Sequence, residues 1–316
     1  MFDRCKWFLI AIALLVLCAG LAAAQNPASG AVPGTLNYLE GSASIDGQAL
    51  GARSIGSARV GLNQVLETQQ GRVEILLTPG VFLRLDNNSA VRMISPNLID
   101  TRVELLRGEA MVEAAEIFKE NNLRIVVNGN STLLSKPGLY RFNADHPEVS
   151  VFDGEAFVTI GDRQIKVTKG HQVLLTGAVK ANKFDRDRSH DALYAWSNLR
   201  SEYAAEASMQ SARTLVVGGP GLGWGYGWYW NPWWDMYGFV PGDGIFYSPF
   251  GYPFFSPGFV YAAPYYGFRH PFGYRGGALA ARGFAGSRGF AGRGFAGSAH
   301  FSGGGFGGGR MGGGHR

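Results

Sequence analysis

Turn signals recur about every ten residues between Leu36 and Thr176, and they limit the segments between them to the length of short β-strands. Within these segments apolar and polar residues alternate, as in Arg72–Ile75, which is typical of strands with one buried face. Asn128-Gly129 is a strong hairpin signal, because both residues tolerate the positive φ angles of a two-residue turn. The pattern predicts an all-β domain at residues 36–180, built either as a sandwich or as a solenoid-like roll.

A weak internal repeat bears on which of these architectures forms. Residues 38–43, 105–110 and 151–156 each place a hydrophobic residue, a polar residue and a glycine before a small residue and a further strand. Stacked strand–turn–strand units of this kind would form a solenoid or roll. A sandwich would also reuse glycine turns, so the repeat leaves both architectures open.

One clear helix is predicted at residues 189–213, between the β-domain and the C-terminal part of the chain. Ser189 is the expected N-cap, and Asp191 in the first turn would interact favourably with the helix dipole. The helix should pack on the β-domain through one apolar face, with its tryptophan as an anchor. The residues of this face are Ala192, Trp196, Leu199 and Tyr203.

Residues 1–24 have the pattern of a secretory signal peptide. A charged start is followed by the uncharged, mostly aliphatic run Trp7–Leu21, and the small residues Ala22 and Ala24 then precede Gln25. This run of fifteen residues is short for a membrane-spanning helix, which needs about 20. We therefore expect cleavage before Gln25 and a mature protein in the periplasm, the cell envelope or the medium of a bacterium. The alternative is an uncleaved segment that anchors the protein in the inner membrane.

Both cysteines, Cys5 and Cys18, lie within the predicted signal peptide. The mature chain would therefore contain no disulfide and no cysteine metal ligand, so its core alone must hold it together. This suits a bacterial envelope protein better than a small disulfide-rich secreted module. Residues 25–35 are small and polar, with two prolines, and are predicted to be a linker.

The composition changes abruptly after Arg213. Of the 47 glycines, 30 lie after this residue, and the same segment holds seven arginines, two aspartates and no lysine. This surplus of five positive charges equals the net charge of the whole chain, so a neutral β-domain precedes a basic tail. Because glycine loses much backbone entropy on folding, residues 214–274 are predicted to be irregular but adhesive, and residues 275–316 to be disordered.

The C-terminal part contains two sets of candidate interaction residues. Five tryptophans form a dense cluster, and three arginines recur in Arg-Gly-Phe-Ala-Gly repeats. Arginine attracts anionic headgroups or envelope polymers and tryptophan favours interfaces, which indicates envelope adhesion or self-association. Stacking on carbohydrate, a plain spacer and binding of single-stranded RNA are the alternatives. The candidates are Trp224, Trp228, Trp230, Trp233, Trp234, Arg282, Arg288 and Arg293.

Convergent catalytic groups cannot be assembled from the sequence, so we predict that the protein is not an enzyme and uses no cofactor, metal or small-molecule substrate. The six histidines include no pair at the spacing of metal ligands. Glu113, Glu116 and Glu120 would share one face of a helix, and we interpret them as a solvated charged surface.

Four segments in the middle of the chain carry a resemblance to a known family. They are Gly71–Leu77, Val81–Leu85, Asn88–Met93 and Val103–Ala110, of which the last contains a Leu-x-x-Gly-Glu-Ala signature. The region from about residue 60 to residue 175 resembles the FecR domain family, the extracytoplasmic sensor module of bacterial iron-citrate-type transport regulators. Leu139–Phe142 departs from the pattern, because the family usually has Gly-Thr-x-Phe there. The resemblance implies an all-β, solenoid-like envelope domain that binds proteins and has no catalytic activity.

These observations favour a non-enzymatic, exported protein whose FecR-like domain binds an unknown envelope protein. The tail would attach it to the outer membrane, to the cell wall or to other copies, and removal of residues 214–316 should leave a folded protein that has lost envelope association. The alternative is a membrane-anchored sensor or regulator that keeps its N-terminal apolar segment and signals through a partner. An RNA-binding protein is a third hypothesis, although export argues against a nucleic-acid partner.

Overall fold

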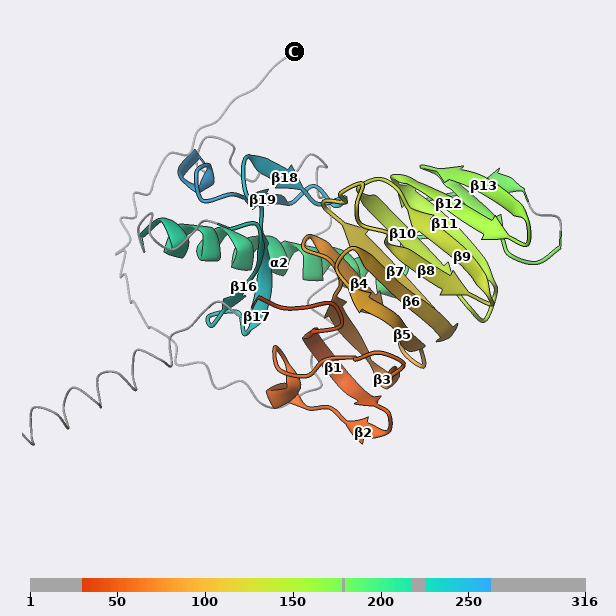
Figure 1. The fold of residues 1–316 in the computed structure, drawn as a ribbon, viewed down its shortest axis with the longest axis horizontal. Helices are drawn as coiled ribbons and strands as arrows, with labels where there is room; N and C mark the ends of the chain where they lie inside the picture. Colours follow the sequence, from red (N-terminus) through yellow and green to blue (C-terminus); the bar gives the residue numbers. More distant parts are fainter. Residues whose placement is uncertain (1–29, 178–179, 218–224, 263–316) are drawn as a thin grey trace, which may run out of the picture. The chain divides into compact units, whose positions relative to one another are not determined.

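The computed structural model describes residues 30–177, 180–217 and 225–262 (Figure 1). They form an all-β domain, one long helix and two C-terminal hairpins, which confirms the predicted all-β class with a helix after it. The remaining residues lie outside the description, and with them the predicted signal peptide and disordered tail. The candidate residues outside it are Ala22, Ala24, Gln25, Trp224, Arg282, Arg288 and Arg293.

Fifteen strands of the described chain form one sheet. They are β1 (Leu36–Ile45), β2 (Gln48–Ala49), β3 (Val65–Leu76), β4 (Val81–Leu85), β5 (Ala90–Asn97), β6 (Asp100–Arg107), β7 (Glu109–Ala114), β8 (Arg124–Val127), β9 (Asn130–Leu134), β10 (Gly138–Asn143), β11 (Glu148–Asp153), β12 (Glu155–Ile160), β13 (Arg163–Thr168), β14 (His171–Leu174) and β15 (Ala181–Lys183). Hydrogen-bonded neighbours follow the order β13-β12-β9-β8-β6-β5-β3-β4-β7-β10-β11-β14-β15, and β1 pairs with β3 and β2. Paired strands are antiparallel, except for the parallel pair of β6 and β8.

The sheet folds over itself into two layers. β3 pairs with β5 through Val65–Glu67 and with β4 through Val73–Leu76, so it passes from one layer to the other. We call the side that contains β5, β6, β8, β9, β12 and β13 layer A, and the side that contains β4, β7, β10, β11, β14 and β15 layer B. The end strand β13 lies beside β11, so the two ends of the sheet come together (Figure 1). The main apolar core draws on strands of both layers and lies between them.

The three glycines of the sequence repeat mark the places where the chain changes layer. Gly108 joins β6 of layer A to β7 of layer B, and Gly154 joins β11 of layer B to β12 of layer A. Gly41 lies in β1 opposite Gly71 of β3, at a register shift where both strands bend from one layer to the other. Strands commonly turn such corners at glycines and bulges. The repeat therefore describes corners of a roll-like sandwich, and not stacked solenoid units.

Alanine at Gly108 is expected to cost about 2–4 kcal/mol of unfolding free energy. Gly108 has a φ of +72°, which an alanine side chain disfavours, and an added Cβ would lie 2.7 Å from the Cα of Ser89. Gly129 is a matched control, because its φ is +74° but an added Cβ would have open space around it. Urea unfolding of Gly129→Ala should show a loss of about 1–2 kcal/mol, from the backbone alone. Equal losses in the two variants would show that the close approach at Gly108 does not matter.

The long helix is α2 (Ala192–Val217), which begins and ends a few residues later than predicted. Asp191 is its N-cap, because the Asp191 carboxylate accepts a hydrogen bond from the Tyr194 backbone N–H at 3.0 Å. The prediction of Ser189 as the cap is wrong, since the Ser189 hydroxyl donates to the carbonyl of Asp185 instead. Within the described part of the chain, no helix is both long and apolar enough to cross a membrane.

α2 covers the outer face of layer B with a face that the sequence pattern did not indicate. Of the predicted apolar face, Trp196 is buried, but Leu199 and Tyr203 are more than a third exposed. The face that is buried is made mostly of small and polar side chains, so it gives no apolar periodicity. Its members are Leu193, Trp196, Ser197, Arg200, Ser201, Ala204, Ala205, Ala207, Ser208, Met209, Ser211 and Ala212.

The described part of segment 214–274 continues α2 to Val217 and then forms two hairpins, where we expected irregular chain. They are β16 (Gly227–Asn231) with β17 (Met236–Val240), and β18 (Ile245–Tyr247) with β19 (Pro253–Phe255). Trp228, Phe239 and Phe254 are buried in a second apolar core, which also includes Phe82 of layer B. The aromatic residues that suggested an adhesive surface thus form much of the cover of layer B.

One glycine of this segment serves close packing and not disorder. A Cβ at Gly238 in β17 would lie 2.6 Å from the backbone nitrogen of Ser208 in α2. The side-chain amide of Asn231 donates to the Ala207 carbonyl at 3.0 Å and so joins the same hairpin to the helix. Glycine content alone could not distinguish this close approach from a flexible chain.

Candidate functional site

A cluster of buried polar side chains lies between layer B and α2. Its four charged members come from β3, β4, β7 and α2, and each is at most 3% exposed. A buried charge is costly unless it is paired, so the contacts among these side chains determine whether the cluster is stable. We call it the buried charge cluster, and it consists of Asn37, Glu74, Arg84, Glu113, Arg200 and Ser201.

Arg84 is at the centre of the buried charge cluster. Its Nε donates to Glu74 Oε2 at 2.7 Å, and its Nη1 donates to Glu113 Oε2. The helix supplies two further donors: Arg200 Nη2 lies 3.0 Å from Glu74 Oε1, and Ser201 Oγ lies 2.7 Å from Glu113 Oε1. Each carboxylate is therefore bound from both the sheet and the helix.

Asn37 extends the cluster to the first C-terminal hairpin. Its Nδ2 donates to Glu74 Oε1 at 2.9 Å, and its Oδ1 accepts the backbone N–H of Tyr237 at 2.7 Å. The Arg200 guanidinium lies over the ring of Tyr38, 3.9 Å from its centroid, which adds a cation–π contact. The cluster thus joins layer B, α2 and β17 in one arrangement.

The pKa values of the two carboxylates shift in opposite directions. Burial alone would raise the pKa of Glu74, but the guanidinium groups of Arg200 and Arg84 outweigh it and hold that pKa below its ordinary value. Burial raises the pKa of Glu113, because Arg84 and the Ser201 hydroxyl offset only part of the lost hydration. Glu74 is accordingly the more firmly ionised of the two.

Glutamine variants at these positions should change the pH dependence of stability in opposite ways. With a lowered pKa, Glu74 contributes stability that is lost as the pH falls below 4.5, the ordinary glutamate value, so Glu74→Gln should flatten the acid limb. With a raised pKa, Glu113 retains its proton longer when folded, so stability declines as the pH rises above 4.5 and Glu113→Gln should remove that decline. Urea unfolding between about pH 3 and pH 8 measures both slopes. The same slope change in both variants would contradict the assignment.

The buried charge cluster corrects one interpretation drawn from the sequence. Glu113, Glu116 and Glu120 do not share a helical face, since Glu113 lies in β7 and is fully buried. The sequence could not show this, because the partners of Glu113 on β4 and α2 lie 29 and 88 residues away. The cluster is enclosed, so its role is to hold α2 on layer B and not to meet a substrate.

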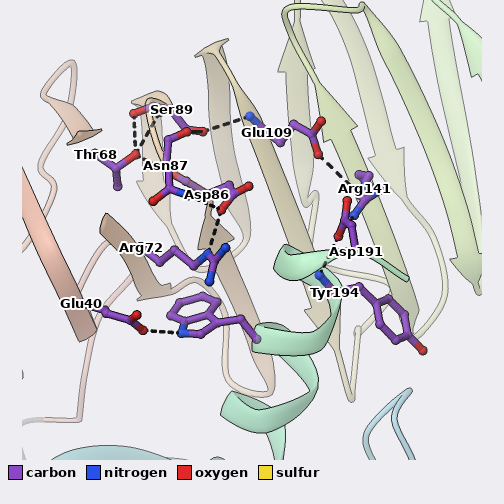
Figure 2. A network of polar contacts seen from close by, with 11 residues as sticks. Glu40, Thr68, Arg72, Asp86, Asn87, Ser89, Glu109, Arg141, Asp191 and Tyr194 are labelled. Atoms are coloured by element: carbon purple, nitrogen blue, oxygen red, sulfur yellow. Dashed lines mark hydrogen bonds and ion pairs between the residues drawn. The ribbon is translucent and has the colours of Figure 1, made fainter. Parts of the chain in front are cut away.

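Partly exposed ion pairs hold the start of α2 against the sheet (Figure 2). Besides capping the helix, Asp191 pairs with Arg141 Nη2 of β10 at 2.5 Å. Arg141 Nε also lies 3.7 Å from Glu109 of β7, so the chain of charges runs from the sheet to the helix cap. These contacts help to fix the orientation of α2 on layer B.

Trp196 anchors the next turn of α2, as predicted. Its Nε1 donates to Glu40 Oε2 of β1 at 2.9 Å, and the Arg72 guanidinium lies 5.8 Å from its ring centroid. Arg72 in turn binds Asp86 at 2.7 Å (Figure 2). Polar contacts therefore tie the helix to β1 and β3 as well as to β7 and β10.

The outer face of layer A differs, because its strands alternate buried and exposed side chains. The strand register aligns one outward row across β6, β8, β9, β12 and β13, spanning about 19 Å at the usual strand spacing. Two half-buried apolar side chains lie in its middle and cations lie at its ends. This layer A row consists of Arg102, Arg124, Leu133, Phe157 and Lys166.

The structure separates the tryptophan candidates. Trp228 is buried, 5.0 Å from the ring of Phe82. Trp230 packs on Tyr237 and is half-buried, and Trp234 is also half-buried. Trp233 is 88% exposed at the turn between β16 and β17. Trp233 is thus the described candidate most open to a ligand.

In the part of the chain that the structure describes, no group of three or more histidine, cysteine, aspartate or glutamate side chains could hold a metal ion. The polar side chains that do converge are those of the buried charge cluster and of the ion pairs around α2. Their geometry supports packing of the helix, and the layer A row and Trp233 are two of the surfaces that remain accessible to solvent.

Comparison with known proteins identifies the central part of the β-domain. The family model described as FecR protein matches residues 64–157. Two crystal structures of a candidate anti-sigma factor from Parabacteroides distasonis ATCC 8503 are similar at 16% identity, with TM-scores of 0.35 and 0.36. They align with 40% and 42% of this chain and with 62% and 64% of their own, so the chain spans less than two thirds of their length. No curated protein matches. From just before β3 into β12, this chain is similar to the FecR domain family.

Proposed function

We propose that this is a non-enzymatic, exported protein of the bacterial envelope whose FecR domain binds a protein partner. The tail would attach it to the envelope surface or to other copies. The observation that carries the proposal is the contrast between the two layers. Layer B is covered by α2 and the hairpins, whereas layer A presents its outer face to solvent. Because α2 and the hairpins of the same chain already cover layer B, the outer face of layer A remains available for a partner.

The layer A row supports the choice of surface and of partner. Leu133 and Phe157 face each other across β9 and β12, and the Lys166 ammonium lies 6.0 Å from the Phe157 ring centroid. Apolar side chains framed by charged ones suit a partner segment with an apolar centre and a polar rim, although Arg102 and Lys166 already pair with Asp100 and Glu155 of this chain. An extended row of this kind, which crosses five strands, fits a macromolecule better than a small substrate.

Site-specific photo-crosslinking in cells tests this surface. A photoreactive phenylalanine analogue at Leu133 should give a discrete crosslinked band, and the additional change Phe157→Glu should remove it. Leu174 on β14 is the matched control, since it is an exposed leucine in layer B. Crosslinking of equal yield at Leu133 and Leu174, unaffected by Phe157→Glu, would overturn the assignment of the partner to layer A.

Export and anchoring are tested by the N-terminal residue and intact mass of the protein from separated cell fractions. A chain that begins at Gln25 in the periplasm, the outer envelope or the medium supports export with cleavage. A chain that begins at Met1 in the inner membrane contradicts it and supports the membrane-anchored sensor. The tail is tested separately, by removing residues 263–316 and following sedimentation with envelope fractions. Unchanged sedimentation would contradict its role in attachment.

A further inference from the structure

We propose that Trp233, Trp234 and Gln210 form a binding site for an uncharged glycan, on which a sugar ring stacks against the exposed indole. The three side chains line a shallow hollow of about 440 Å³ between the β16–β17 turn and α2. This volume lies within the range of small-ligand sites. The site lies outside residues 64–157, which match the FecR family, and it does not depend on residues 263–316, so it goes beyond the proposed function.

The turn that carries Trp233 is fixed in place. Asn231 Oδ1 accepts the backbone N–H of Trp233 at 3.0 Å and that of Trp234 at 3.4 Å, which forms an Asx turn. The amide nitrogen of the same Asn231 donates to the Ala207 carbonyl in α2. A side chain that is 88% exposed is therefore presented from a backbone bound to the helix. Such preorganisation lowers the entropic cost of binding a ligand.

The neighbouring side chains complete a surface suited to sugars. The Trp234 ring packs against Tyr203 of α2, with centroids 5.5 Å apart and an interplanar angle of 31°. Gln210 adds an amide that can both donate to and accept from hydroxyl groups. A pyranose has C–H groups on its ring face and hydroxyl groups around its rim. The C–H groups can pack on the aromatic rings, and the hydroxyl groups can form hydrogen bonds with the amide.

The charges around the hollow argue against an anionic lipid surface. Asp235 follows Trp234 in the turn, and Glu206 lies one helical turn before Gln210, with Glu202 one turn earlier on the same helix. Arg213, three residues after Gln210 on the same helix, is a cation whose charge acts on Glu206. Three carboxylates against one guanidinium would repel phosphate headgroups, whereas uncharged sugars carry no such penalty. A second copy is disfavoured because a stable dimer buries about 800 Å² per partner, far more than one exposed indole.

Titration calorimetry on the full chain tests the site with two probes, a neutral trimer of N-acetylglucosamine and a trimer of glucose. We expect saturable binding of at least one, and the comparison distinguishes an amino-sugar polymer from a glucan. Trp233→Ala should weaken the affinity about tenfold or more, and Trp233→Tyr should retain it within about threefold, because tyrosine also offers a stacking face. Tyr247→Ala is the matched control, since Tyr247 is an exposed aromatic residue on the other hairpin and should have no effect.

Three results would overturn the inference. The first is no saturable binding of either sugar up to about 10 mM, a level at which even weak sites are occupied. The second is an affinity that Trp233→Ala and Tyr247→Ala reduce equally. The third is sedimentation with vesicles of phosphatidylglycerol, or self-association in ultracentrifugation, that Trp233→Ala abolishes while sugar binding is absent. The third result would assign Trp233 to a lipid surface or to a second copy.

Discussion

Replacement of Arg84 by methionine should lower the free energy of unfolding by about 3–5 kcal/mol. Arg84 is fully buried and donates to both Glu74 and Glu113. Methionine fills a similar volume but leaves Glu113 with the Ser201 hydroxyl in place of its cation, while Glu74 keeps Arg200. The loss therefore reports the uncompensated charge at Glu113 and not a cavity. Urea or thermal unfolding measures it.

An exposed arginine provides the matched control. Arg107 pairs with Glu67 at 3.1 Å, but both side chains are more than a third exposed. Solvent screens such a pair, so Arg107→Met should cost less than about 1 kcal/mol. Adding Glu113→Leu to Arg84→Met should restore part of the loss, since the unpaired carboxylate is then removed. A cost for Arg84→Met no greater than that for Arg107→Met would contradict the pairing of Arg84 with Glu74 and Glu113.

Truncation after Val217 should abolish cooperative unfolding, whereas truncation after Ala262 should leave the unfolding midpoint unchanged. The shorter chain lacks both hairpins and exposes Phe82 on layer B, which is otherwise covered by Trp228 and Phe254. Each buried aromatic side chain of this kind is worth several kcal/mol, so the combined loss exceeds the stability of an ordinary domain. Circular dichroism during thermal unfolding distinguishes the two truncated chains.

This expectation moves the C-terminal boundary of the folded part of the chain, which the composition had placed near residue 213. The glycine-rich segment after residue 213 looked removable as a whole, yet its first part includes the end of α2 and the cover of layer B. A chain that ends at residue 217 and still unfolds cooperatively, with the midpoint of the chain ending at 262, would contradict the role of the hairpins. Phe239→Ala in the full chain is a milder test of the same role, and it should lower the free energy of unfolding by about 3–5 kcal/mol.

The parts of the fold that local chemistry determines were predictable from the sequence. The turns at Asp46-Gly47 and Asn128-Gly129 have positive φ at both residues, as hairpin turns of this composition require. The alternation of apolar and polar residues predicted the strands of layer A, which have one solvated face. The FecR resemblance over the central strands was confirmed by the match at residues 64–157.

The parts that depend on distant partners were not predictable. Strands β4 and β7 are buried on both faces, so the charges they carry had no pattern that separated them from surface charges. The buried face of α2 is small and polar because it meets carboxylates and a closely packed hairpin, so hydrophobic periodicity selected another face. The tryptophans posed the same difficulty, since identical residues serve as core at Trp228 and as exposed surface at Trp233.

The long span of the contacts at the buried charge cluster determines when the fold can be completed. Arg200 and Glu74 are separated by 126 residues, and Asn37 and Tyr237 by 200. A chain emerging from a ribosome or a translocation pore cannot close layer B until residue 237 is free, because that residue pairs with one near the beginning. Contacts of such sequence separation slow folding, and the nascent chain keeps Phe82 and its charged neighbours open to water and to chaperones for most of its synthesis. The C-terminal hairpins can therefore cover layer B only after residues 225–262 have been synthesised.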